Sequence, residues 1–188
     1  MTRVLVPIAP GFEEIEAITI IDVLRRGGVE VVTAGLSSSE PVEGAHGIRI
    51  GVDAALGTVH SQSFDMLVLP GGEPGVTNLA ASAALHETLS RHLGAGRALG
   101  AICAAPRILA SRGELAGRNA TSHPSVEAQL REGGALYDGV RRVVRDGTLV
   151  TSRGPGTALE FALEVLEMLG HENEARRLRT AMLVAPGA

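Results

Sequence analysis

The stretch that decides the fold reads Ala98-Leu99-Gly100-Ala101-Ile102-Cys103-Ala104-Ala105-Pro106, and it holds the only cysteine of the chain. A short apolar run ends at Cys103, and a helix-prone run at 107–110 follows. This order predicts a strand, a sharp turn and a helix, with the thiol at the turn. Helix amides and the helix dipole would then lower the pKa of the thiol below about 8.5. The alternative is a small core residue, because free cysteine is often buried. The local pattern does not decide between a reactive thiol and a buried core residue.

Around this stretch, short β-branched runs alternate with longer segments of helical period. Strands are expected at 3–8, 29–34, 66–69 and 98–102, and helices at 13–26, 76–93 and 106–112. This alternation predicts an α/β fold with a mostly parallel sheet and helices on both faces. Asp146-Gly147 between two apolar runs predicts a hairpin toward the C-terminal end, and 157–169 has the apolar spacing of a helix. We expect one domain over residues 1–188.

The composition fits a globular protein of this kind and argues against several function classes. The chain has 188 residues, of which 45% are hydrophobic and 20% charged, which suits a single core. Aromatic residues are only 2% and the net charge is −4, so nothing indicates a nucleic-acid-binding surface. One cysteine permits no internal disulfide. The sequence shows no signal-peptide pattern and no membrane-length apolar run, so a cytoplasmic protein without membrane contact is expected.

Polar or glycine-rich segments follow three of the predicted strands. Glu16 lies after the strand at 3–8, Gly71-Gly72 follows the strand at 66–69, and Cys103 ends the strand at 98–102. Sites in open α/β sheets form at the carboxyl ends of the strands, so these groups converge if the strands are neighbours. A carboxyl group can bind a thiolate or move a proton, and glycine amides can bind a developing oxyanion.

Each of these features also has a plainer interpretation. Glu13, Glu14 and Glu16 fit a first helical turn by the dipole alone, although Glu13 and Glu16 share a face. Pro-Gly-Gly commonly forms turns, and neither nucleotide-binding glycine pattern is present. His123, in Ser122-His123-Pro124, is the histidine that stands out, yet a lone loop histidine is usually a surface residue. No second cysteine or paired-histidine spacing supports a zinc site.

Five motifs together resemble one family. They are Glu13-Glu14-Ile15-Glu16, Leu69-Pro70-Gly71-Gly72, Ala101-Ile102-Cys103-Ala104, Ser122-His123-Pro124 and Thr151-Ser152-Arg153-Gly154-Pro155-Gly156-Thr157. Their order and spacing over essentially the whole chain resemble the ThiJ/PfpI superfamily, in the branch of the Parkinson-disease-associated deglycase and bacterial YajL. The resemblance implies a flavodoxin-like three-layer sandwich, a homodimer, and a reactive Cys103 in a strained elbow. Ala105 departs from the glycine usual in the family, so the elbow has to accept a Cβ there.

The resemblance also implies roles for individual positions. Cys103 matches the nucleophile, Glu16 the carboxyl group that hydrogen-bonds its sulfur, and His123 an imidazole of the site. The amides that face the substrate oxygen are expected from Gly72 and from Ala104, the residue after Cys103. Gly71, beside Gly72, is expected to belong to the same oxyanion and substrate-binding group. Two further positions match residues that lie near the pocket from the partner subunit, Arg26 and Pro155. No cofactor and no metal are expected.

The activity implied by the resemblance is that of a cysteine-dependent, glutathione-independent glyoxalase or a protein or nucleotide deglycase. Such an enzyme, a lyase or hydrolase, would act on small reactive dicarbonyls such as methylglyoxal and glyoxal or on their adducts, with a stress-protective role. The thiolate of Cys103 would add to an aldehyde carbon, with Glu16 and His123 moving protons. The alternative is a redox-sensing chaperone, in which Cys103 is oxidised to the sulfinate without turnover.

Overall fold

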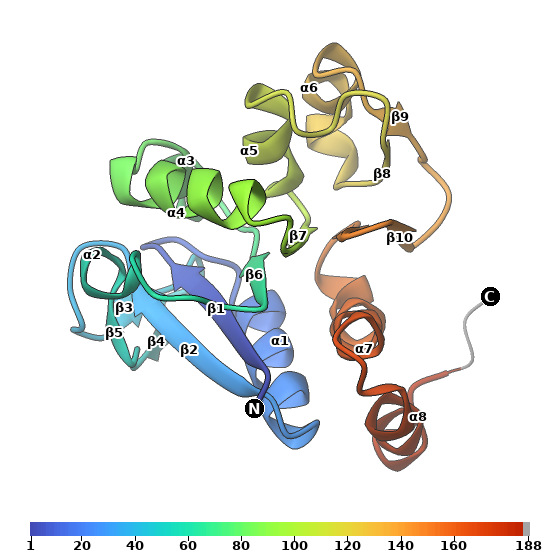
Figure 1. Ribbon diagram of the computed structural model, residues 1–188, viewed down its shortest axis with the longest axis horizontal. Coiled ribbons are helices and arrows are strands. Elements are labelled where there is room, and N and C mark those ends of the chain that lie inside the picture. The colour runs from blue at the N-terminus through green and yellow to red at the C-terminus, as the bar shows by residue number, and fades with distance from the viewer. Residues whose placement is uncertain (186–188) are drawn as a thin grey trace.

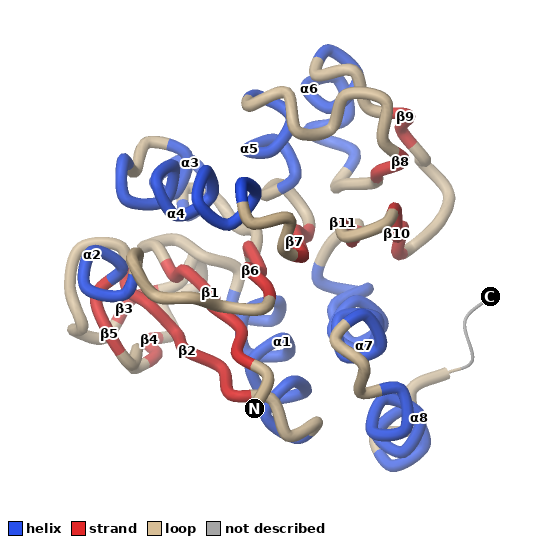
Figure 2. Tube along the Cα trace, in the orientation of Figure 1, coloured by secondary structure: helices blue, strands red, loops and turns tan. Residues whose placement is uncertain are grey.

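A single mixed sheet forms the centre of the protein. The computed structural model describes residues 1–185, so the last three residues of the predicted domain, 186–188, lie outside it. The strands run in the order β10-β11-β7-β6-β1-β2-β5, from right to left in Figure 2. All neighbours pair in parallel except β10 and β11, so the predicted mostly parallel sheet is confirmed. The strands are β1 (Arg3–Ile8), β2 (Glu30–Gly35), β5 (Ala54–Ala55), β6 (Met66–Leu69), β7 (Ala98–Ile102), β10 (Val143–Asp146) and β11 (Leu149–Ser152).

Helices cover both faces of this sheet, as the alternating pattern predicts, which makes the flavodoxin-like three-layer sandwich that the resemblance implies (Figure 1). One face packs against α1 (Glu14–Arg26), α7 (Ala158–Met168) and α8 (Glu172–Ala181). The other face packs against α2 (Leu56–Val59), α3 (Gly75–Ala80), α4 (Ala83–Gly94), α5 (Pro106–Ser111) and α6 (Glu127–Glu132). Successive side chains of a strand point to opposite faces, so Leu5 joins one core while Val4 and Val6 join the other.

Two expectations about helices differ from the structure. The single helix expected at 76–93 is two helices, because α3 ends at Ala80 and α4 begins anew after Ser82. Its hydroxyl accepts a hydrogen bond from the Leu85 N–H at 3.2 Å, as an N-cap residue does. Helices α2, α6 and α8 were not predicted from the sequence. The α8 segment is mostly polar, and Ala175 and Leu178 are its buried residues.

The predicted hairpin at Asp146-Gly147 is present, and β11 joins it to the sheet by pairing with β7. Two short strand pairs lie outside the main sheet: β3 (Val42–Glu43) with β4 (Arg49–Ile50), and β8 (Asn119–Ala120) with β9 (Leu136–Tyr137). We call residues 42–50 the β3–β4 arm. Within residues 1–185, every helix is too short or too polar to cross a membrane. Since β1, β6 and β7 are neighbours, the three candidate segments do meet at one sheet edge.

Candidate active site

Cys103 lies at the expected turn between a strand and a helix. Strand β7 ends at Ile102, and Cys103 has a backbone φ of 63°, a left-handed conformation that costs a residue with a side chain about 1 kcal/mol. Two backbone hydrogen bonds hold it there. Its N–H donates to the Ser152 carbonyl at 3.0 Å, and its carbonyl accepts from the His123 N–H at 2.9 Å. Ala105 has a helical φ of −63°, so the elbow accepts its Cβ without backbone strain.

Glu16 lies in the first turn of α1 and is fully buried beside Cys103. Its Oε2 accepts a hydrogen bond from the Gly71 N–H at 2.8 Å. A Cβ placed on Gly71 would lie 2.6 Å from both Glu16 Oε2 and Cys103 Cβ, so the two side chains flank this glycine. The other carboxyl oxygen, Oε1, is buried and has no hydrogen-bond partner among the described N and O atoms. Besides the Gly71 N–H, the Cys103 thiol faces this carboxyl group.

Two backbone amides, those of Gly72 and Ala104, point at the Cys103 sulfur. Gly72 has a φ of 95°, and a Cβ there would lie 2.2 Å from the Glu13 nitrogen, so only glycine fits. Gly71 was expected to bind an oxyanion with its N–H, but in the structure this N–H donates its hydrogen bond to Glu16. The turn therefore directs one amide to the carboxylate and the next to the sulfur.

The charge state of this pair corrects the expectation of an acidic thiol. Burial raises the pKa of Glu16 to about 7. Burial raises the pKa of Cys103 most, and the negative charge of Glu16 raises it further, to about 12. The two amides lower it by a smaller amount. The prediction that the elbow lowers the pKa of the Cys103 thiol is therefore wrong when Glu16 carries its negative charge. When Glu16 is protonated, its repulsion of the thiolate disappears and its O–H can donate to the sulfur.

His123 is placed at the elbow by its backbone, while its ring is exposed. Ring Nδ1 accepts the Ser125 N–H at 3.2 Å and lies 2.8 Å from the Ser125 hydroxyl. A backbone N–H can only donate, so the neutral ring carries its hydrogen on Nε2. Among the described contacts, the ring makes no hydrogen bond to Glu16 or Cys103. A catalytic role for His123 stays a prediction.

Arg26 and Pro155, the positions expected near a partner's pocket, lie apart in this chain. Arg26 is in the last turn of α1, about 15 Å along the helix from Glu16, and pairs with Asp22 at 2.7 Å. Pro155 begins a 3₁₀ turn after Gly154, where an added Cβ would lie 3.6 Å from the His123 ring. Their contribution to a partner's site stays a prediction.

Comparison with known proteins decides the family. A sequence profile of the DJ-1/PfpI family matches residues 2–168. The chain belongs to the DJ-1/PfpI family. It is 42% identical to the protein dj-1beta of Drosophila melanogaster over 181 residues, which are 96% of each chain. It is also 42% identical to a glutathione-independent glyoxalase, DJR-1.2 of Caenorhabditis elegans, over 92% of this chain and 91% of that one. The Parkinson disease protein 7 homolog of Danio rerio is 37% identical over 97% of both chains.

Solved structures of DJ-1/PfpI proteins share the fold. The crystal structure of Drosophila melanogaster DJ-1beta matches with a TM-score of 0.94 at 41% identity and covers 98% of this chain and 99% of its own. An oxidised DJ-1 of Toxoplasma gondii matches with a TM-score of 0.93 at 37% identity, over 99% of this chain and 100% of its own. The resemblance stated from the five motifs is thus confirmed.

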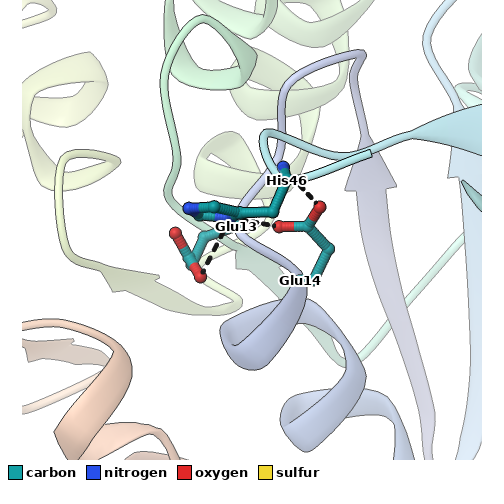
Figure 3. A group of neighbouring side chains, drawn as sticks. All are labelled: Glu13, Glu14 and His46. Atoms are coloured by element: carbon teal, nitrogen blue, oxygen red, sulfur yellow. Dashed lines mark hydrogen bonds and ion pairs between the residues drawn. The ribbon is translucent and has the colours of Figure 1, made fainter. Parts of the chain in front are cut away.

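A second polar cluster near the DJ-1/PfpI site was not predicted. It consists of Glu13, Glu14 and His46, whose nearest ligand atoms all lie within 4.8 Å of one another (Figure 3). His46 Nδ1 is 2.9 Å from Glu14 Oε2 and 3.9 Å from Glu13 Oε1. Glu14 already accepts hydrogen bonds from the backbone and ring of His46, so a metal ion would have to break the ring contact. No local sequence pattern indicates the contact between Glu14 and His46, because 32 residues separate them.

Proposed function

We propose that this DJ-1/PfpI protein is a cysteine-dependent, glutathione-independent glyoxalase with a stress-protective role. The observation that carries the proposal is the buried carboxyl group of Glu16, with a pKa of about 7, beside the thiol of Cys103. A group with this pKa can both give and take a proton near neutral pH. The substrates would be methylglyoxal and glyoxal, small dicarbonyls that a half-buried thiol can reach.

The first step is addition of sulfur to the aldehyde carbon. The carboxylate form of Glu16 accepts the Cys103 proton, an S–C bond forms, and the carbonyl π bond breaks to give an oxyanion. The N–H groups of Gly72 and Ala104 face the sulfur and would stabilise the oxygen on the adjacent carbon. Protonation of this oxygen gives the hemithioacetal. Glu16, protonated in part at neutral pH, is the nearest acid for that step.

The second step moves hydrogen between the two carbons of the dicarbonyl. Glu16 as carboxylate removes the proton from the former aldehyde carbon, which gives an enediol, and a proton returns to the neighbouring carbon. The product is a thioester of a 2-hydroxy acid on Cys103. Water then cleaves the S–C bond and releases lactate from methylglyoxal or glycolate from glyoxal. His123 would assist as a second acid or base from the open side of the elbow.

The test is formation of D-lactate from methylglyoxal without glutathione. Wild type should form lactate, while Cys103→Ser and Glu16→Gln should each lose at least ~100-fold of the rate, because each removes a group that acts on the reacting atoms. Glu87→Gln, on an exposed carboxylate of α4, is the matched control and should keep the wild-type rate. Lactate formation that survives Cys103→Ser would refute the assignment.

Two extensions follow from the same site. At the carbinol carbon of a hemithioacetal or aminocarbinol, the Cys103 sulfur would form the same S–C bond while the bond to the protein thiol, or to the protein or nucleotide amine, breaks. The displaced group would take up a proton and leave, which would appear as deglycase activity. We also propose a homodimer, since α1 exposes Ile15 and Ile18, which are 57% and 43% exposed, and the β3–β4 arm exposes Ile48. Arg26 and Pro155 would then approach a partner's site. A cytoplasmic location stays a prediction.

The second candidate function is redox sensing by Cys103, with no turnover. The unpartnered Oε1 of buried Glu16 favours it, because a protonated carboxyl there could donate to a sulfinate oxygen. Two molecules of hydrogen peroxide would convert the thiol to the sulfinic acid and release two of water. If wild type forms no lactate but gains two oxygens by intact mass, and Glu16→Gln goes on to the sulfonate, this function replaces the first.

A further inference from the structure

The loop of residues 11–13 lies between the β3–β4 arm and the glycine turn of the site. On the arm side, the Gly11 N–H donates to the Glu43 carbonyl and the Ala45 N–H donates to the Phe12 carbonyl, both at 2.9 Å. These bonds pair the loop with the arm as if it were a neighbouring strand. The arm is therefore attached to the segment from which α1 begins.

On the other side, the same loop supports residues 71–75. The Glu13 N–H donates to the Gly71 carbonyl at 2.9 Å, and the Gly75 N–H donates to the Gly11 carbonyl at 3.0 Å. The contact is tight, since a Cβ on Gly72 or Gly75 would lie 2.2 or 2.7 Å from a backbone nitrogen of the loop. A displacement of the loop therefore displaces the two amides that hold the Glu16 carboxylate and face the Cys103 sulfur.

Glu14 and His46 fix the arm to this loop. Glu14 is only 3% exposed, and its Oε1 accepts the His46 N–H at 2.7 Å and the Ile48 N–H at 3.4 Å. Its Oε2 lies 2.9 Å from His46 Nδ1 (Figure 3). The carboxyl also occupies the space beside Gly44, where a Cβ would lie 2.4 Å from Oε1. One carboxylate thus binds the arm at its backbone and at a side chain.

We propose that Glu14 and His46 form a clasp that positions the 71–75 turn, and through it Cys103 and Glu16, for reaction. The expected effect on lactate formation rests on the proposed function. The expected effect on the reactivity of the Cys103 thiol does not. Glu14 and His46 are positioning residues, since neither touches the sulfur.

The charges of the clasp agree with this role. Burial alone would raise the pKa of Glu14, yet the hydrogen bonds from His46 and Ile48 hold it below its ordinary value. The pKa of His46 is raised chiefly by the hydrogen bond between its ring and Glu14, and to a lesser extent by the negative charges of Glu13 and Glu14. Both shifts favour an imidazolium–carboxylate pair. Glu13, which also raises the pKa of Glu16, faces this imidazolium.

The test measures alkylation of Cys103 by iodoacetamide as a function of pH. Cys103 is the only cysteine, so the rate reports this site alone. His46→Ala should slow alkylation at pH 7 on the order of tenfold and raise its midpoint pH, because displacement of the Gly72 amide removes a group that lowers the thiol pKa. His46→Asn, which keeps an N–H where Nδ1 lies, should restore most of the rate. Arg49→Ala, on the exposed surface of the same arm, should match wild type.

Lactate formation supplies the second readout. The clasp predicts that His46→Ala lowers kcat by about the same factor as the alkylation rate, with KM nearly unchanged. The His46 side chain is 68% exposed, so its variants should fold, and circular dichroism with the unfolding midpoint checks this. An alkylation profile of folded His46→Ala equal to that of wild type, or a faster one, would overturn the clasp. If wild type forms no lactate, the proposed function fails while the alkylation profiles still decide the clasp.

Discussion

Replacing Gly71 with alanine should separate the two reactive groups with a single methyl group. Gly71 has no left-handed backbone that would require glycine, so the substitution tests packing alone. The new Cβ would lie 2.6 Å from Glu16 Oε2, 2.6 Å from Cys103 Cβ and 3.1 Å from the Ile102 carbonyl oxygen. Ordinary contact begins at 3.4 Å, so the Glu16 carboxyl has to move by roughly 0.8 Å from the new methyl group, and the Gly71 backbone and the elbow have to separate by a similar distance.

The elbow is stiff, because backbone hydrogen bonds to Ser152 and His123 hold Cys103. The Gly71 backbone therefore moves away from the elbow while the Glu16 carboxyl moves away from the new methyl group, and the 2.8 Å hydrogen bond from the Gly71 N–H to Glu16 lengthens or breaks. A buried hydrogen bond to a charged acceptor contributes about 1.5–3 kcal/mol, which is the expected loss in the free energy of unfolding. A misplacement near 1 Å in the reacting groups costs on the order of 100-fold in rate.

Chemical denaturation and D-lactate formation measure the two effects. Gly57→Ala is the matched control, since Gly57 lies in α2 with nothing within 4 Å of its added Cβ. That control should keep the wild-type rate and gain up to about 1 kcal/mol of stability, because alanine favours a helix. If Gly71→Ala kept wild-type stability and rate, Glu16 would not be held as the structure describes, and the roles assigned to it would fall.

Three further outcomes can be measured. The folded pKa of Glu16 is raised from 4.5 to about 7, so the unfolded state releases its proton first. The contribution of Glu16 to the free energy of unfolding is complete below pH 4.5, and roughly 3 kcal/mol of it is lost as the pH rises through 7. Denaturation at several pH values should therefore show a free energy of unfolding that varies less with pH in Glu16→Gln than in wild type. Cys103→Gly should be more stable than Cys103→Ala by about 1 kcal/mol, since the φ of 63° disfavours a Cβ; equal stabilities would contradict the strain. Phe161→Ala should lower the free energy of unfolding by about 3–5 kcal/mol, because Phe161 is fully buried; a loss under 1 kcal/mol would contradict its place in the core.

The fold and the meeting of the three segments could be predicted because they depend on local patterns. An apolar run followed by Cys103 and Pro106 determines where the strand stops and the helix starts, and both ends agree with the structure. The break at Ser82 was also encoded, since serine is a strong N-cap residue, but the helical periodicity on both sides concealed it. Glu14 and His46 could not be paired, because the arm that carries His46 has strands of only two residues.

The wrong expectation for the thiol shows which physical effect the sequence cannot supply. A helix terminus contributes about 0.3–1 kcal/mol, less than one pKa unit, and α5 is only six residues long. Burial can shift a pKa by 3–5 units, and the extent of burial at Cys103 depends on how separate elements pack. The same burial raises the pKa of Glu16 and leaves a proton on it near neutral pH. The amount of thiolate at Cys103 therefore depends first on the burial of the sulfur and next on the charge of Glu16, and the short helix is a minor contributor.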